Sequence, residues 1–146
     1  MDTKGGFLIS RIKQAGGRLF DRLLAEAGID EFNGAQGRIL YVLWQGDGLT
    51  ISQICAQTSL ANTTLTSMLD RMERAGLIVR EPSPTDRRAL LIRLTDKARE
   101  LQRDYDRISQ QMNALYYTGF SPEEIRQFEG YLLRVLDNVQ GGTTHE

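Results

Sequence analysis

The chain has 146 residues, of which 40% are hydrophobic and 25% charged, a composition that suits one globular domain with a core of its own. The formal net charge is −1, and a single cysteine excludes an internal disulfide framework. No apolar run reaches the length that spans a bilayer, and the first ten residues lack the apolar segment of a signal peptide, so we expect a cytoplasmic protein without membrane contact.

Two helices are predicted in the first third of the chain. The first covers residues 7 to 27, where apolar side chains recur at helical spacing, and Gly28 is a natural end for it. The second begins at Asn33, because Gln36 three residues later completes the pattern of a capping box, and it ends in the segment 45–48. Each helix has one apolar face, which predicts that it packs against other elements.

Two further helices, separated by a short break, are predicted between residues 50 and 76. Thr50 and Gln53 form a second capping box, which opens a helix that continues to about residue 57. The next helix follows a break at residues 58–61 and is terminated by Gly76. Its apolar residues recur at helical spacing and are expected to be buried: Leu65, Met68, Leu69 and Met72. Short polar side chains fall largely on the other side of this helix.

The next segment predicts a β-hairpin. Residues 77–81 (LIVRE) and 90–94 (LLIRL) are rich in leucine and β-branched residues and are flanked by prolines and polar residues. The connecting segment PSPTDRRA is longer than a tight turn, so we expect this loop to project from the body of the protein.

The last third of the chain is predicted to be helical. Its first apolar series has a heptad-like spacing and comprises Ala98, Leu101, Tyr105, Ile108, Met112 and Leu115. A further helix begins at Ser121, where Pro122 and Glu124 complete a strong start signal. The apolar faces of these helices can be covered by the chain's own core, by a second copy of the chain, or by both. Three apolar-striped helices are more than one chain would cover well, which favours a homodimer.

The residue inventory disfavours enzymatic and metal-dependent functions. The only histidine, His145, lies in a polar C-terminal segment, and Cys55 is the only cysteine. A His/Cys metal cluster cannot form within one chain, and a histidine-activated nucleophile is not expected. No pair of carboxylates stands at a distinctive spacing. We therefore expect neither an enzyme nor a metal or other cofactor.

Two short helices followed by a hairpin are the order of a winged helix-turn-helix, so the predicted fold is mainly α with a small antiparallel β-wing. Residues 61–99 hold eight Lys or Arg against five Asp or Glu, a local excess of positive charge that suits a polyanionic partner. The polar face of the second short helix is predicted to enter a DNA major groove, because short side chains allow close approach to base edges. The residues expected to contact DNA there are Asn62, Thr63, Thr64, Thr66, Ser67 and Arg71.

The projecting loop supplies a second predicted DNA contact. Arg87 and Arg88 stand at its tip and suit the narrow minor groove, where the negative potential is strongest; Arg88 is the favoured candidate for insertion. Asp86 is expected to orient one of these arginines through a carboxylate–guanidinium pair. Arg80 and Arg93 on the strands are interpreted as salt-bridge or phosphate-flanking residues. The side chains predicted to position phosphates are Arg38, Thr50 and Ser52.

Together, these segments resemble the MarR (multiple antibiotic resistance regulator) family of bacterial transcription factors. The similarity rests on TTLTSMLDRMERAGLI running into the first strand, on the DRR triplet at the wing tip, and on LIRLT leading into the next long helix. One departure is Ala61, which stands where a helix-capping Ser or Asp is expected. A missing cap costs about 0.5–2 kcal/mol, and Ser59 is the nearest side chain that could help.

The resemblance implies a homodimer that reads a pseudo-palindromic operator in double-stranded DNA, often as a repressor that a small-molecule effector relieves. It also implies a single MarR-type domain over residues 1–146. In that domain, residues 1–31 and 100–146 would form a helical dimerisation region, and residues 32–99 would form the winged helix-turn-helix DNA-binding lobe. The effector pocket of such proteins typically lies between the two parts. Repression and activation are both compatible with the sequence.

Two alternatives stay open at this point. A winged helix can serve as a protein-interaction module that does not bind DNA. Cys55 could sense oxidants, as cysteines do in some relatives, but its place on the apolar side of a short helix favours a small buried hydrophobe. A reactive thiol needs exposure and a positive neighbourhood.

Overall fold

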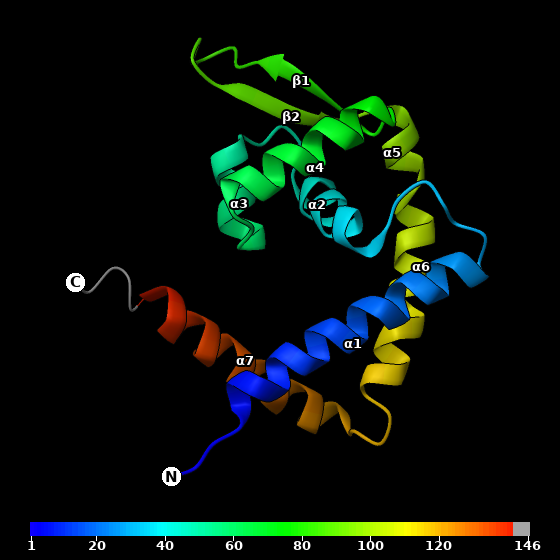
Figure 1. Cartoon of the computed structure of the whole chain (residues 1–146), viewed down its shortest axis with the longest axis vertical. Coiled ribbons are helices and arrows are strands. Elements are labelled where there is room, and N and C mark those ends of the chain that lie inside the picture. The colour runs from blue at the N-terminus through cyan, green and yellow to red at the C-terminus, as the bar shows by residue number, and fades with distance from the viewer. Residues whose placement is uncertain (142–146) are drawn as a thin grey trace. The chain divides into compact units, whose positions relative to one another are not determined.

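The computed structural model describes residues 1–141 and shows a mainly helical chain with one small antiparallel sheet, which confirms the predicted fold class (Figure 1). His145, on which the metal argument partly rested, lies outside the described residues. In chain order the elements are α1 (Gly5–Glu26), α2 (Gly34–Gln45), α3 (Ile51–Thr58), α4 (Asn62–Arg74), β1 (Ile78–Pro82), β2 (Leu90–Leu94), α5 (Asp96–Glu100), α6 (Gln102–Tyr116) and α7 (Pro122–Gly141).

The chain divides into two compact units. Residues 1–110 form the first unit, which contains α1 to α5, the hairpin and most of α6; the second unit begins at Gln111. Every residue predicted to contact DNA lies in the first unit. The candidate site therefore belongs to a single compact body.

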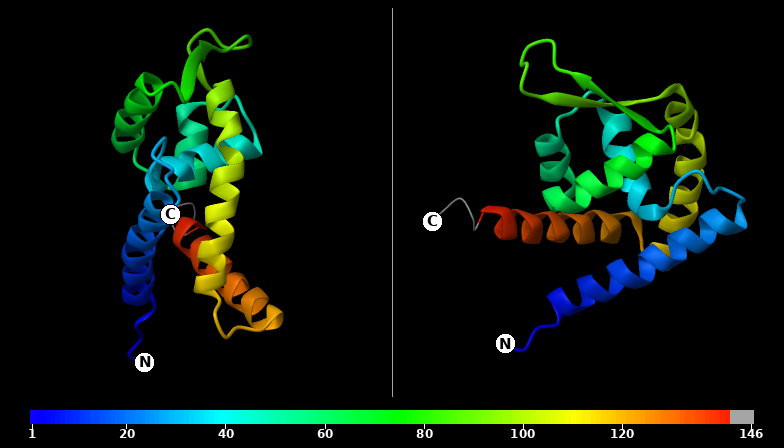
Figure 2. Two further views of the ribbon diagram at one scale, coloured as in Figure 1. Left: turned by 90° about the vertical axis from the view of Figure 1, so that its right-hand side faces the viewer. Right: turned by 45° about the horizontal axis from the view of Figure 1, so that its top comes forward.

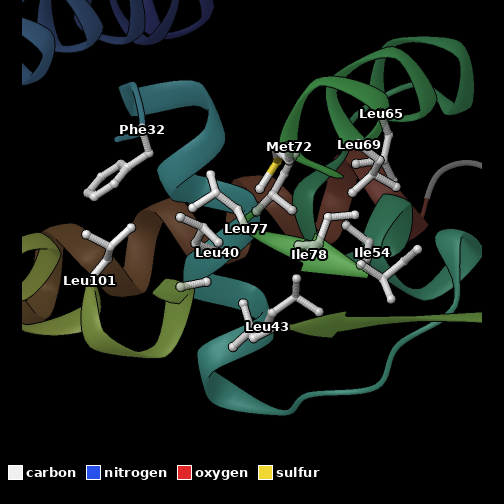
Figure 3. Close-up of a cluster of buried hydrophobic side chains, with 14 of the residues drawn as sticks. Phe32, Leu40, Leu43, Ile54, Leu65, Leu69, Met72, Leu77, Ile78 and Leu101 are labelled. Carbon is white, nitrogen blue, oxygen red and sulfur yellow. The ribbon is translucent and has the colours of Figure 1, made fainter. Parts of the chain in front are cut away.

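The core of the first unit forms where α2, α3 and α4 meet the hairpin and α5. α4 contributes its predicted stripe: Leu65, Leu69 and Met72 are fully buried, and Met68 is half-buried. Figure 3 shows these three buried side chains in one cluster with residues of α2, α3 and β1. Burying one such side chain stabilises the fold by about 1.5–3 kcal/mol. The cluster thus fixes which face of α4 points inward and which face stays at the surface.

Hydrogen bonds confirm the predicted helix starts. Asn33 Oδ1 accepts the Gln36 N–H at 2.8 Å, and the Asn33 N–H donates back to Gln36 Oε1 at 3.1 Å. Thr50 and Gln53 form the same reciprocal pair at 3.1 and 2.9 Å. Gly76 follows α4 with a φ of 77°, a conformation that favours glycine and ends the helix where the sequence predicted.

The wing has one connection that the sequence did not reveal. β1 and β2 pair antiparallel at the predicted positions, within a residue. Leu49, just before α3, exchanges two backbone hydrogen bonds with Ile92 of β2, at 2.7 and 3.2 Å. Asp47 reinforces this link, because its Oδ1 accepts the Leu94 N–H at 3.0 Å. The segment 45–48, predicted only as a helix end, therefore anchors the base of the wing.

The heptad-like series from Ala98 to Leu115 is buried in its first part and exposed at its end. α5 and α6 are separated by Leu101, so the series does not lie on one unbroken helix. Ala98, Leu101 and Ile108 are buried in the core of the first unit, whereas Leu115 in the second unit is 53% exposed. The first part of the series is thus covered by the chain's own core, one of the alternatives left open by the sequence.

In the second unit, α7 begins at the predicted capping box. The Ser121 N–H donates to Glu124 Oε1 at 2.9 Å, and Ser121 Oγ accepts the Glu124 N–H at 3.1 Å. Tyr117, just before this turn, donates its hydroxyl to Glu129 Oε2 at 2.6 Å. This hydrogen bond to a carboxylate raises the pKa of Tyr117 to about 12. The Tyr117 hydroxyl therefore ties the end of α6 to α7.

No helix within residues 1–141 has both the length and the apolar character needed to cross a membrane. The same residues contain no group of three or more His, Cys, Asp or Glu side chains placed to hold a metal ion.

Candidate nucleic-acid interface

α4 presents the residues that the sequence predicted for a major groove. Its buried stripe faces the core, so the other side of the helix lies at the surface. Thr66 is half-buried, and the other predicted contacts are exposed: Asn62, Thr63, Thr64, Ser67 and Arg71. Hydroxyl and amide groups on short side chains thus form a polar ridge, which is the chemistry that hydrogen-bonds to base edges.

The start of α4 has no side-chain cap. Ala61 is the N-cap residue and makes no capping hydrogen bond. Ser59 does not replace it, because Ser59 ends α3 in the left-handed conformation, with a φ of 59°, and donates its N–H to Cys55 O at 2.8 Å. Asn62 Oδ1 instead accepts the Thr66 hydroxyl at 3.3 Å. This bond links two of the predicted contact residues across one turn of the helix.

The end of α4 is completed by residues that follow the wing. Lys97 Nζ donates to Ala75 O at 3.0 Å, and Thr95 Oγ1 donates to Gly76 O at 2.6 Å. Carbonyl groups at a helix C-terminus have no partner within the helix, and a cation there also matches the helix dipole. Lys97 and Thr95 therefore join the end of α4 to α5.

Ser83 and Asp86 order the wing loop. Ser83 Oγ accepts the N–H groups of Thr85 and Asp86 at 3.3 and 3.2 Å, and Asp86 Oδ1 accepts the Arg88 N–H at 3.0 Å. Bonds of this kind, from a short polar side chain to the backbone a few residues on, define turns. Arg87 and Arg88 are thus carried on a loop with a specified shape.

Asp86 supports this loop differently from the prediction. The sequence led us to expect a carboxylate–guanidinium pair, but in the described chain Asp86 forms no ion pair with Arg87 or Arg88 and binds the Arg88 backbone instead. The aspartate side chain is short, and the N–H two residues on is within its reach. Both guanidinium groups consequently stay exposed at the wing tip.

The wing and α4 are in direct contact within the first unit. β1 packs against α4, and Arg80 of β1 donates to Asp70 Oδ1 at 2.8 Å and to Glu73 Oε1 at 3.0 Å on α4. Figures 1 and 2 show the hairpin above α4, with its loop projecting from the body of the unit. The two elements predicted to meet DNA therefore belong to one body.

Two other arginines of residues 61–99 are also held by acids. Arg93 Nε lies 2.6 Å from Glu81 Oε2 across the hairpin, which, with the contacts of Arg80, confirms the salt-bridge interpretation of both strand arginines. Arg99 pairs with Asp47 at 3.1 Å and with Asp96 at 2.9 Å, and hydrogen bonding to Asp47 is the main cause that raises the pKa of Arg99. These cations are therefore neutralised locally.

The remaining arginines of this segment have no carboxylate partner. Within the part of the chain that the structure describes, they are exposed and form no ion pair: Arg71, Arg74, Arg87 and Arg88. Arg74 donates only to a backbone carbonyl, that of Asp70, at 3.3 Å. The arginines of this segment without an ion pair are thus found on α4 and at the wing tip, the two places predicted to meet DNA.

The residues predicted to position phosphates are spread over two helices. Arg38 is exposed on α2, Ser52 is exposed on α3, and half-buried Thr50 uses its Oγ1 to cap α3. No hydrogen bond or ion pair links these three described residues to one another. Thr50 and Ser52 therefore lie together at the start of α3, and Arg38 lies on α2 without a hydrogen bond to either.

Some supporting residues were not predicted as part of the site. Ser83 could have been recognised, because Ser-Pro-Thr-Asp is a turn-forming sequence. The roles of Asp47, Asp70 and Glu73 have no short-range signal, because each contacts an arginine or a backbone group at least seven residues away.

Sequence comparison relates the chain to known regulators. The model of the MarR family matches residues 32–90. The HTH-type transcriptional regulator TtmR of Methylorubrum extorquens (strain PA1) is 30% identical over 139 residues, which cover 95% of this chain and 69% of that protein.

Solved structures share the fold. The crystal structure of the transcriptional regulator SlyA superposes with a TM-score of 0.85 at 23% identity and covers 96% of each chain. A mutant MarR from E. coli complexed with operator DNA gives a TM-score of 0.80 at 24% identity, covering 93% of this chain and 99% of that one. At these identities the similarity shows the fold alone.

Proposed function

The chain belongs to the MarR family of transcriptional regulators, and from this premise we propose that it binds double-stranded operator DNA. Membership of this family also places it among regulators and not enzymes, as the sequence predicted. α4 enters the major groove, and Arg88 at the wing tip enters the neighbouring minor groove. The proposed contact residues are Asn62, Thr63, Thr64, Thr66, Ser67, Arg71, Asp86, Arg87 and Arg88, with Arg38, Thr50 and Ser52 at phosphates.

One observation carries this proposal. The polar ridge of α4 and those arginines of residues 61–99 that lack a carboxylate partner lie on α4 and the wing, two parts of one compact unit that touch through β1. Exposed guanidinium groups of this kind bind the phosphates of DNA and displace the counterions that surround its backbone. A mutant MarR with the same fold has been crystallised with operator DNA, which supports the same use of this surface here.

We further propose that the regulator is a homodimer. α1 exposes Phe7 and Leu8 at 65% and 47%, and α7 exposes Tyr131 and Val139 at 58% and 68%. Large apolar side chains exposed along a helix are typical of an interface. A two-fold dimer presents two α4 helices to the half-sites of a pseudo-palindromic operator. Residues 1–31 and 100–146 would then form the dimerisation region and residues 32–99 the DNA-binding lobe, in a cytoplasmic protein.

We propose repression relieved by a small-molecule effector as the mode of control. An open hollow of about 340 Å³ lies between the end of α1 and the start of α2 and is lined in part by Leu24, Ile29, Phe32 and Gln36. Its volume is at the lower end of the range for ligand pockets. This hollow lies between the proposed dimerisation region and the proposed DNA-binding lobe, which supports the effector hypothesis.

A DNA-binding titration tests the central proposal. Labelled DNA from the region flanking the protein's own gene is titrated with the purified protein at several salt concentrations, alongside a shuffled duplex of the same length. We expect tighter binding to the native sequence and a logarithm of affinity that falls linearly with the logarithm of salt concentration. A protein-interaction module would show no salt-dependent affinity for either duplex, and that result would exclude the DNA-binding function.

A further inference from the structure

Arg80 connects β1 to α4 through two carboxylates at once. Its Nη2 lies 2.8 Å from Asp70 Oδ1 and its Nη1 lies 3.0 Å from Glu73 Oε1, so one guanidinium engages two acids with different nitrogens. The side chain of Arg80 is only 20% exposed, compared with 52% for Asp70 and 44% for Glu73. The guanidinium therefore lies mostly between the strand and the helix, with the two acids at its edge.

Asp70 and Glu73 lie on the same side of α4 as the polar ridge, about one turn beyond Ser67 and two turns beyond Thr66. A helix turns about 100° per residue, so Asp70 lies about 60° from Ser67 around the helix axis, and Glu73 lies about 20° from Thr66. Carboxylates in this position repel a nearby phosphate backbone. Arg80 pairs with both acids and offsets one of their two negative charges, so part of this repulsion is removed.

Stability alone gives little reason for this arrangement. Ion pairs between partly exposed side chains contribute little to folding. A guanidinium is planar and holds its donors in a rigid fork, so binding two carboxylates one helical turn apart fixes its orientation relative to α4. Because Arg80 is part of β1, the strand takes up a defined orientation as well.

We propose that Arg80 is a positioning residue, which with Asp70 and Glu73 holds the wing at a fixed angle to α4 and does not itself contact DNA. This inference rests on the proposed function. From Arg80 the chain runs along β1 into the loop ordered by Ser83 and Asp86. The orientation set at Arg80 therefore determines where Arg88 lies when α4 occupies a major groove.

A charge-removal experiment distinguishes positioning from simple electrostatics. The double variant Asp70→Asn with Glu73→Gln removes two negative charges from the DNA-binding lobe and leaves Arg80 in place. Electrostatics alone predicts tighter operator binding. Positioning predicts that binding weakens roughly 5- to 50-fold, within the range of couplings between neighbouring residues. Unchanged or tighter binding at matched salt would overturn the inference.

The matched control is Asp96→Asn with Glu100→Gln on α5. It makes the same change in charge at two exposed acids outside the α4–β1 contact. We expect operator binding by this control to be unchanged or slightly tighter. Circular dichroism and thermal melting of both double variants establish that each is folded.

A measurement without DNA tests the same inference independently. Spin labels are attached at Thr64→Cys on α4 and Arg87→Cys at the wing tip, in a Cys55→Ser background diluted with unlabelled protein. We expect a narrow distribution of distances between the two labels when Arg80, Asp70 and Glu73 are unaltered. The distribution should broaden in the double variant Asp70→Asn with Glu73→Gln and in Arg80→Met. Equal widths would overturn the inference even if operator binding weakens. Because no DNA is present, this result stands whether or not the protein binds an operator.

Discussion

Arg88 combines a specified backbone with an unpaired side chain. Its N–H is held by Asp86 Oδ1 at 3.0 Å, while its exposed guanidinium has no ion pair within the described chain. We expect Arg88→Ala to weaken operator binding by about 1–3 kcal/mol, because it removes a specific groove contact. Fluorescence anisotropy at one fixed salt concentration measures this change. Arg103→Ala, at an exposed arginine on α6, is the control; equal affinities of the two variants would remove Arg88 from the interface.

The wing-turn role of Asp86 predicts different effects for two substitutions. Asp86→Ala removes the acceptor for the Arg88 N–H. The loss of such a hydrogen bond destabilises the turn by about 0.5–1.5 kcal/mol, so this variant should bind the operator more weakly. Asp86→Asn keeps an oxygen at the same place, so the turn should persist and operator binding should stay close to that of the unaltered protein. Anisotropy titrations of both variants under one buffer condition check this. If Asn weakened binding as much as Ala, the charge of Asp86 would matter and not its hydrogen bond to the backbone.

At the scale of elements, the sequence predicted what depends on near neighbours. The capping boxes at Asn33 and Thr50 and the apolar stripe of α4 involve residues within two turns. Both boxes and most of the stripe were confirmed, and Met68 alone in the stripe is half-buried. The bridge of Leu49 to Ile92 could not be predicted, because it pairs residues far apart in the chain through backbone groups that any sequence provides. A salt bridge was predicted for Arg80, but its partners Asp70 and Glu73 were not, because they depend on how β1 packs against α4.

The connection between α6 and α7 predicts a pH-dependent stability. Tyr117→Phe removes the hydroxyl that binds Glu129, and we expect it to lower the free energy of unfolding by about 0.5–1.5 kcal/mol at neutral pH. The folded-state pKa of Tyr117 is raised from 10.0 to about 12, so the stabilisation is fully present below the unfolded value and is lost as pH rises through the folded one.

Urea unfolding of Tyr117→Phe and the unaltered protein at several pH values measures this difference. The difference in free energy of unfolding between the two proteins should be constant near neutral pH. It should disappear as the pH rises from the unfolded-state pKa of Tyr117 to its folded-state pKa. A gap that stays open above the higher value would contradict the assignment. Tyrosinate absorbance provides a second readout. The variant should have one tyrosine fewer that ionises above the ordinary tyrosine pKa.

For the whole molecule, the proposed dimer makes a prediction about mass. Light scattering should give twice the chain mass of 16.5 kDa. Leu132→Glu with Val139→Glu places two charges on one apolar stripe of α7, where Val139 is 68% exposed, and should shift the protein toward the monomer, because burying unpaired charge is costly. Gln127→Glu with Asn138→Glu adds the same charge at exposed polar positions and should leave the mass unchanged. A persistent dimer in the first variant would place the interface elsewhere.

The hydrogen bond from Lys97 to Ala75 has a practical consequence for labelling. Lys97 is the only lysine in residues 32–99, and the other cations of that segment are arginines. Acylating reagents and biotin esters react with amines and leave guanidinium groups intact. Within this segment such reagents modify the one lysine, whose amine binds the backbone at the end of α4. Because amine coupling at Lys97 removes its positive charge and its hydrogen bond to the end of α4, attachment through an engineered cysteine is the sounder way to immobilise this regulator.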